Sequence, residues 1–169
     1  SSTSRGLGDV YKRQDIAYLK ARLATEVPVA RSGGAYLTVR DQDKKKLLNS
    51  ASKLVELGFN LFATPGTADY LRENDIPVEV AYRIRESKHP DALDLMRQGK
   101  ISFIVNVPTV SGGAVRDGNM MRRLAVELNI PFVTTIRGAD MEVAAIRAQQ
   151  KGEVAVSYTH LTLPTKRIV

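Results

Sequence analysis

Apolar side chains recur along the chain with two different periods, and these predict helices and strands in alternation. From Asp43 to Leu57 they return every three or four positions and form one stripe of an amphipathic helix. Gly58 follows at the position where a glycine commonly ends a helix. By the same reasoning we predict helices at 68–73, 91–97, 117–128 (capped by Asp117) and 139–149, and strands at 35–39, 59–63, 78–82, 101–107 and 131–135.

The alternation of strands and helices predicts the fold class. It indicates an α/β protein with a three-layer α/β/α architecture, in which five parallel strands form a doubly wound sheet. The most continuous apolar run, Ile101–Val107, is typical of a central strand that is buried on both faces. Ligands of such folds bind beyond the carboxyl edge of the sheet. The loops of interest are therefore 40–43, 64–67, 83–89, 107–117 and 135–138.

The two ends of the chain are related through DNA rather than through protein structure. One codon string for Asp9–Gln14 (DVYKRQ) has a reverse complement that, in another frame, encodes Val156–His160 (VSYTH). Such inverted ends resemble translated adapters from a sequencing library. We therefore expect residues 1–14 and 156–169 to be non-native, and the native chain to continue on both sides.

The remaining chain divides into a short N-terminal segment and one domain. Residues 15–24 have helical spacing, and residues 25–34 contain proline, serine and two glycines, which break any pattern. We interpret residues 15–34 as the end of an upstream region followed by a linker. Residues 35–155 are long enough to form one domain with its own core.

Composition narrows the possible classes of function. The net charge is +7, but the two predicted non-native ends contribute five basic residues and one acidic residue. Residues 15–155 therefore carry about +3, which gives little support for nucleic-acid binding. Cysteine is absent and His89 is the only histidine of residues 15–155, which argues against disulfides and a zinc site. No apolar run approaches the roughly 20 residues that cross a bilayer, so we expect a cytoplasmic protein without metal ligands or membrane contacts.

Hydroxyl and cationic side chains gather at the predicted carboxyl edge of the sheet. Thr64 and Thr67 bracket a Pro-Gly pair after the second strand, and Lys44 opens the helix after the first. Hydroxyls, a cation and the free N–H groups of a helix N-terminus are groups that bind phosphate. Gly66 lets the backbone approach such an anion closely. The other polar residues at this edge are Arg83, Asn106, Thr109 and Thr134.

Each of these residues also has an explanation that needs no ligand. Pro-Gly is a common turn, Thr67 can cap a helix, and a run of lysines usually lies in water. Asn106 can bond a loop backbone, and a histidine such as His89 is more often a surface residue than a base. The prediction of an anion site therefore rests on the agreement of several loops.

Three motifs together resemble a known family. They are YLTVRDQDKKKLLNSASKLVELGFNLFATPGTADYLRENDIPVEV (36–80), IVNVP (104–108) and MRRLAVELNIPFVTT (121–135). The pattern is similar to the methylglyoxal-synthase-like domain, and within that family to the C-terminal allosteric domain of carbamoyl phosphate synthetase large subunits. The resemblance covers nearly all of residues 18–150 and implies a domain that binds nucleoside monophosphate effectors, typically UMP or IMP in bacterial members.

The resemblance also implies a role for each polar residue. Lys44, Thr64, Thr67 and Arg83 would hold the effector phosphate, and Gly66 would allow its close approach. Asn106 would contact the base or ribose. The family often follows this asparagine with two threonines, where the chain has Val107 and Pro108, so Thr109 is the expected substitute. Ornithine is another effector of some members and contacts the region after the fifth strand. An aspartate of the family in that region is replaced here by Val133, so Thr134 is the remaining candidate for an ornithine contact. No catalytic residue is predicted.

The parent protein implied by the resemblance is a glutamine-hydrolysing ligase of arginine or pyrimidine biosynthesis. Its ATP-grasp domains, the rest of the large subunit and the glutaminase small subunit would lie outside this chain. We expect no cofactor in the chain itself. ATP, Mg²⁺ or Mn²⁺, and K⁺ are expected in the parent enzyme.

The alternative is a methylglyoxal synthase, a lyase that acts on dihydroxyacetone phosphate. That family takes its catalytic aspartate from a glycine-rich loop after the third strand, whereas this chain has RIRESKHPDALD (83–94) without a glycine pair. Asp91 and Asp94 are instead typical of the start of a helix. The cyclohydrolase domain of purine synthesis is a weaker match, because its loop is also missing. An interaction module without a ligand is the third possibility.

Overall fold

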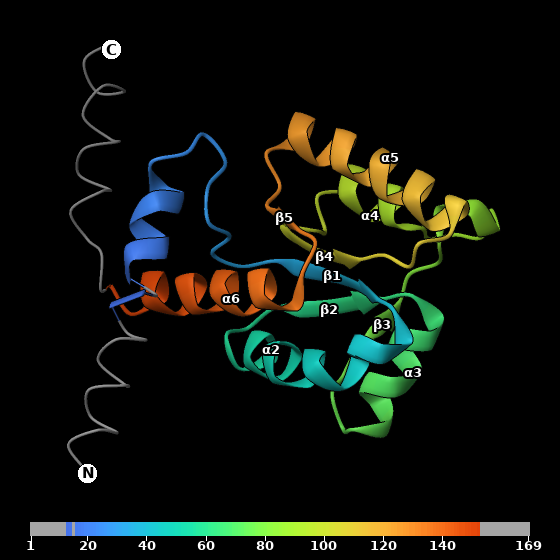
Figure 1. Ribbon diagram of the computed structural model, residues 1–169, viewed down its shortest axis with the longest axis horizontal. Coiled ribbons are helices and arrows are strands. Elements are labelled where there is room, and N and C mark those ends of the chain that lie inside the picture. The colour runs from blue at the N-terminus through green and yellow to red at the C-terminus, as the bar shows by residue number, and fades with distance from the viewer. Residues whose placement is uncertain (1–12, 15, 153–169) are drawn as a thin grey trace.

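The computed structural model describes residues 13–14 and 16–152, and its centre is a five-stranded parallel sheet (Figure 1). The strand order is β3-β2-β1-β4-β5, and every neighbouring pair is parallel. This arrangement confirms the predicted fold class. The strands are β1 (Gly34–Val39), β2 (Asn60–Ala63), β3 (Glu79–Val80), β4 (Phe103–Val107) and β5 (Phe132–Val133).

Helices cover both faces of the sheet, as Figure 1 shows. Alternate residues of β1 point to opposite faces, so Leu37 joins one apolar cluster and Tyr36 joins the other. The cluster around Leu37 packs against α2 (Lys44–Glu56), α3 (Pro65–Glu73) and α6 (Ile136–Gln150). The cluster around Tyr36 packs against α4 (Ala92–Arg97) and α5 (Gly112–Leu128). All five residues of β4 are buried, as predicted for a central strand.

Three helices, α3, α5 and α6, begin earlier than the sequence pattern predicts. Helix α3 begins at Pro65 and α6 at Ile136, each three residues before its predicted start. Proline is well suited to the first helical position, because its missing N–H has no partner there and its φ angle is already helical. Thr135, predicted as a loop residue, caps α6: its hydroxyl accepts a hydrogen bond from the Gly138 amide at 2.9 Å.

The prediction that Asp117 caps a helix is wrong. Helix α5 begins at Gly112, so Asp117 lies within its second turn and is buried. The two glycines at the start of α5 disfavour a helix when their propensity is considered alone. The packing of α5 on the sheet overrides this local preference.

The segment before β1 is attached to the domain by a buried ion pair. Residues 16–23 are helical, and Arg22 on that helix binds Glu142 of α6 through three hydrogen bonds of 2.9, 3.0 and 3.3 Å. The Tyr18 hydroxyl donates to the same carboxylate at 2.6 Å. Arg22 also donates to the Val27 and Pro28 carbonyls, which fixes the first part of the predicted linker. Residues 25–33 contain no regular secondary structure, but these hydrogen bonds attach the segment to the preceding helix.

Two further expectations concern the extent of the chain. The predicted non-native ends lie outside the described residues, apart from residues 13 and 14. Within the part of the chain that the structure describes, no helix is both long and apolar enough to cross a membrane.

Candidate functional site

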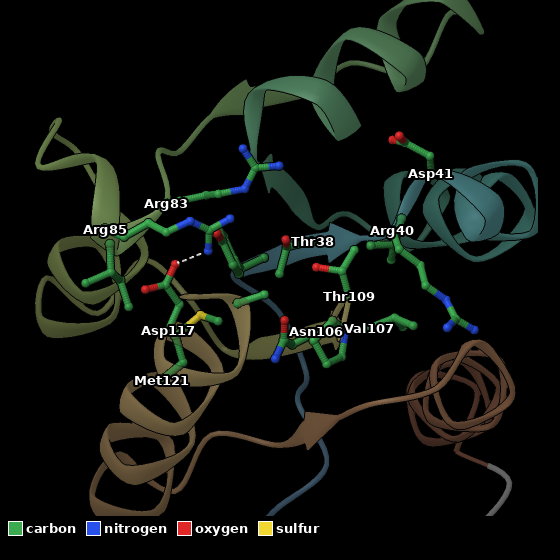
Figure 2. A pocket seen from close by; sticks show the side chains of 15 residues that line it. Thr38, Arg40, Asp41, Arg83, Arg85, Asn106, Val107, Thr109, Asp117 and Met121 are labelled. Atoms are coloured by element: carbon green, nitrogen blue, oxygen red, sulfur yellow. Dashed lines mark hydrogen bonds and ion pairs between the residues drawn. The ribbon is translucent and has the colours of Figure 1, made fainter. Parts of the chain in front are cut away.

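The strand order places a crevice at the carboxyl edge of the sheet. The chain leaves β1 toward β2 on one side and reaches β4 on the other, so the loops after β1 and β4 diverge. A cavity of about 150 Å³ lies at this point. Its walls come from the ends of β1 and β4, the segment after β3, and helix α5 (Figure 2).

Next to this cavity, the residues of the ATPGT motif form a polar cluster at the N-terminus of α3. Thr64 is the N-cap residue, Pro65 is the first helical residue, and Gly66 and Thr67 follow. Because Pro65 has no N–H and the Ala68 amide bonds the Thr64 carbonyl, the free donors of the first turn are the amides of Gly66 and Thr67. The Thr64 and Thr67 hydroxyls are buried and lie 3.3 Å apart. An acceptor with several oxygen atoms would satisfy these donors together.

Lys44 adds a cation to the same place. It is the first residue of α2, and its Nζ lies 3.2 Å from the point that a β-carbon on Gly66 would occupy. Its ammonium also bonds the Asp41 carboxylate at 2.7 Å, which holds the pKa of that exposed carboxyl below its usual range. The structure therefore brings together four of the predicted residues. We call Lys44, Thr64, Gly66 and Thr67 the cradle.

Arg83 stands between the cradle and the cavity. It precedes the short 3-10 helix η2 (Ile84–Glu86), lines the cavity, and bonds Glu86 at 3.1 Å. Its side chain is 39% exposed, so a ligand can reach it. Its charge also contributes to the lowered pKa of Asp41, after the larger effect of Lys44. Arg83 and Asp41, the residue that pairs with the cradle lysine, thus line the same cavity.

Asn106 and Thr109 line the cavity, as predicted, and Thr38 connects the cavity to the cradle. Asn106 is buried, and its Nδ2 lies 2.8 Å from the point that a β-carbon on Gly118 would occupy. Its side-chain amide has no hydrogen-bond partner among the residues that the structure describes. Thr109 Oγ1 lies 3.2 Å from Ser111 Oγ. Thr38 lines the cavity, and its hydroxyl accepts from Thr64 at 3.4 Å.

Thr134 is the one predicted site residue that belongs neither to the cradle nor to the wall of the cavity. It follows β5, is half-buried, and does not belong to the cavity wall. The strand order explains this separation, because β5 is the edge strand beyond β4 and the crevice opens between β1 and β4.

The charged residues of the cavity wall that were not predicted include Arg85 and Asp117. Arg85, after β3, donates to Asp117 of α5 at 2.7 Å across 32 positions of sequence (Figure 2). Both lie within segments that the sequence marks as loops after strands. No local pattern distinguishes Arg85 from Arg83, however, and Asp117 has the signature of a helix cap. Tyr36 also lines the cavity, where burial raises the pKa of its phenol and keeps the hydroxyl neutral.

His89, Asp91 and Asp94 lie outside the cavity wall and serve the start of α4. Asp91 and Asp94 form a reciprocal capping box, which confirms that these carboxylates begin a helix. The exposed His89 ring contacts Asp94 at 2.5 Å, and this hydrogen bond raises the pKa of the imidazole. Their ligand atoms lie within 4.8 Å of one another, a spacing that could hold a metal ion. The capping hydrogen bonds already account for the arrangement.

Comparison with known proteins identifies the family that this fold and site define. Residues 46–134 match the MGS-like domain, and the chain belongs to that family. It is 44% identical over 156 residues to the carbamoyl phosphate synthase large chain, C-terminal section, of Methanocaldococcus jannaschii, covering 92% of this chain and 25% of that protein. The corresponding section from Methanopyrus kandleri is 42% identical over 85% of this chain and 26% of its own length. The chain therefore spans about a quarter of these relatives.

Proposed function

We propose that the chain is the regulatory, nucleoside-monophosphate-binding domain of a carbamoyl phosphate synthase large chain. The observation that carries this proposal is the cradle: a cation, two buried hydroxyls and two free amides meet at one helix N-terminus beside a cavity. The similarity to carbamoyl phosphate synthase large chains supports the choice of parent protein.

The cradle matches the chemistry of a phosphate monoester. The positive end of the α3 dipole and the amides of Gly66 and Thr67 favour an anion. The Lys44 ammonium and the hydroxyls of Thr64 and Thr67 can donate to several of its oxygens. Arg83, which a ligand can reach, closes the site on the side of the cavity. The incoming phosphate would replace the Asp41 carboxylate on Lys44, and that carboxylate is 94% exposed and free to leave.

The cavity beside the cradle would hold the uncharged part of the ligand. Asn106, a buried residue, offers a side-chain amide that has no hydrogen-bond partner among the described residues, and Thr109 offers a hydroxyl. UMP and IMP, which carry one phosphate and a neutral nucleoside, are the ligands we propose. Thr134 makes no contact in this scheme and remains a predicted residue for a separate, ornithine-side contact.

Regulation requires the rest of the proposed parent enzyme. The parent would be a cytoplasmic, glutamine-hydrolysing ligase whose catalytic domains use ATP with Mg²⁺ or Mn²⁺ and K⁺, together with a glutaminase small subunit. An effector would shift the enzyme only by the difference between its affinities for two states of the whole protein. The chain alone would therefore bind the effector without showing regulation.

A thermal-shift measurement with UMP, IMP and inorganic phosphate tests this proposal. A ligand specific for the native state stabilises it by about 2.7 kcal/mol at a hundredfold excess over Kd, so the melting temperature should rise with ligand concentration. No shift at millimolar concentrations of all three ligands would contradict it. Release of phosphate from dihydroxyacetone phosphate would instead support the methylglyoxal synthase alternative.

Replacing Gly66 by alanine should weaken ligand binding without weakening the fold. The new methyl group would point at Lys44 Nζ, into the space we assign to the phosphate, so we expect Kd for UMP to rise about tenfold. Alanine is the better helix former by up to about 1 kcal/mol, so the free energy of unfolding should stay level or increase. Titration calorimetry and urea denaturation measure the two effects.

Gly112→Ala is the matched control for this substitution. Gly112 also lies in the first turn of a helix, and a β-carbon there meets no atom within 4 Å. It should leave UMP binding unchanged. Equal UMP affinity in Gly66→Ala and the unsubstituted protein would place the phosphate elsewhere.

A further inference from the structure

Both cations of the proposed phosphate site already carry a carboxylate of the protein. The Lys44 ammonium bonds Asp41 at 2.7 Å, and the Arg83 guanidinium bonds Glu86 at 3.1 Å. In each pair the two residues are three positions apart, so a short stretch of chain holds the carboxylate beside its cation. An anionic ligand therefore reaches either cation only by exchange with a carboxylate.

Asp41 is the carboxylate that occupies the cradle lysine. Its side chain is 94% exposed, and it lines the cavity on the side away from Asp117 (Figure 2). Within the described part of the chain, its carboxylate has no hydrogen-bond or ion-pair partner other than Lys44. Exposed ion pairs of this kind add little to stability. Removal of the Asp41 charge should therefore leave the fold intact.

The short 3-10 helix η1 (Asp41–Asp43) keeps this carboxylate in place. Its last residue, Asp43, is buried, and its carboxylate bonds the Arg40 guanidinium. The Asp43 amide also donates to the Arg40 carbonyl at 3.0 Å. Lys44 follows at once as the first residue of α2. Because Asp41 and Lys44 belong to one anchored turn, the carboxylate has a high effective concentration at the ammonium.

We propose that Asp41 is a built-in competitor of the phosphate ligand and sets the affinity of the cradle. Its carboxylate, like a phosphate oxygen, is a charged acceptor for the Lys44 ammonium. A phosphate also reaches the amides of Gly66 and Thr67 and the hydroxyls of the cradle, which the Asp41 carboxylate does not bond. Exchange therefore favours phosphate, but the affinity is lowered by the strength of the Asp41–Lys44 pair. The inference rests on the proposed phosphate site in the cradle.

The electrostatics around Asp41 agree with this role. Lys44 holds the pKa of the Asp41 carboxyl below its usual range, through its hydrogen bond and its charge, and Arg83 adds a smaller effect in the same direction. An anion on Lys44 would remove the main cause of this shift and place a negative charge beside Asp41. Binding of the anion should therefore raise the pKa of Asp41.

Asp41→Asn tests the inference by titration calorimetry with UMP, IMP and inorganic phosphate. The variant removes the charge and keeps the size of the side chain, so we expect all three ligands to bind about two- to fivefold more tightly. The factor should be the same for each ligand, because the competition acts on the phosphate alone. Asp41→Glu keeps a carboxylate and should stay within about twofold of the unsubstituted protein.

Asp75→Asn is the matched control for the change in net charge. Asp75 is exposed and lies just beyond the end of α3 that is remote from the cradle. Its φ angle is positive, a conformation that asparagine also adopts. All three affinities should remain unchanged, because exposed charges are screened over roughly 10 Å in salt. An equal gain in Asp75→Asn and Asp41→Asn would reduce the effect to net charge and overturn the inference.

NMR of the Asp41 carboxyl carbon gives a second measurement, with sulfate as the probe. Sulfate stays a dianion while an aspartate titrates, so the pKa of Asp41 can be compared with and without saturating sulfate. We expect sulfate to raise that pKa. In Lys44→Ala the pKa should already lie near its usual value, and the same sulfate concentration should change it little.

The outcomes separate this inference from the proposed function. If Asp41→Asn binds the three ligands only as tightly as the unsubstituted protein does, the competition fails while the cradle stands. Weaker binding by Asp41→Asn would also overturn it, since Asp41 would then position Lys44 for the ligand. If neither protein binds UMP, IMP or phosphate, the proposed function itself fails.

Discussion

Lys44→Ala is expected to weaken the binding of UMP, IMP and inorganic phosphate alike, by about 10–100-fold, since a hydrogen bond to a charged group contributes about 1.5–3 kcal/mol. The ammonium lies close to Gly66 at the N-terminus of α3, and the Lys44 side chain is only 17% exposed. Its loss removes a cation that every phosphate ligand would use, whatever the nucleoside. Titration calorimetry with the three ligands measures the effect.

Lys45→Ala is the control for this prediction. Lys45 is the next residue of α2 and carries the same charge, but it is exposed and no ion pair is formed by it among the described residues. It should bind all three ligands within about twofold of the unsubstituted protein, because exposed charges are screened over roughly 10 Å in salt. Equal losses in the two variants would mean that only general charge matters and that the cradle is misplaced.

Glu142→Ala is expected to produce the largest loss of stability, about 3–5 kcal/mol in the free energy of unfolding. The substitution leaves the Arg22 guanidinium largely buried, with a side-chain exposure of 16%, and without its carboxylate. It also removes the acceptor of the Tyr18 hydroxyl. Urea denaturation followed by circular dichroism measures the change.

Glu127→Ala and a double-mutant cycle with Arg22→Ala serve as controls for this stability effect. Glu127 is exposed on α5, so its removal should cost less than about 0.5 kcal/mol. Because Arg22 and Glu142 are in direct contact, the losses of their single variants should not add. A loss below 1 kcal/mol in Glu142→Ala would contradict the view that this pair fastens residues 16–23 to α6.

The grouping of the cradle residues could be predicted from sequence because they follow strands β1 and β2. In a parallel sheet the carboxyl ends of all strands share one edge, so Lys44, Thr64 and Thr67 had to lie near one another once the strands were recognised. The starts of α3 and α5 could not be predicted equally well. Pro65 suits the first position of a helix but suits a turn equally well, so it does not mark the start of α3 by itself. The glycines at 112 and 113 disfavour a helix locally, and only packing on the sheet explains why α5 includes them.

The remaining features depend on contacts between distant segments. Arg85 and Asp117 are 32 positions apart, and Arg22 and Glu142 are 120 apart. No periodicity or capping signal links such residues, because each pair forms only after two helices have packed. The sequence therefore predicts which residues gather at the N-terminus of α3, but not which distant side chains complete the wall of the cavity.

A crystal structure of the chain with saturating UMP or IMP would test most directly whether the cradle binds phosphate. We expect the phosphate at the N-terminus of α3, with its oxygens about 2.7–3.0 Å from Lys44 Nζ, the amides of Gly66 and Thr67, and the Thr64 and Thr67 hydroxyls. We also expect the Asp41 carboxylate to have left Lys44. A nucleotide whose phosphate lies elsewhere, with the Lys44–Asp41 pair intact, would show that the cradle is not the phosphate site.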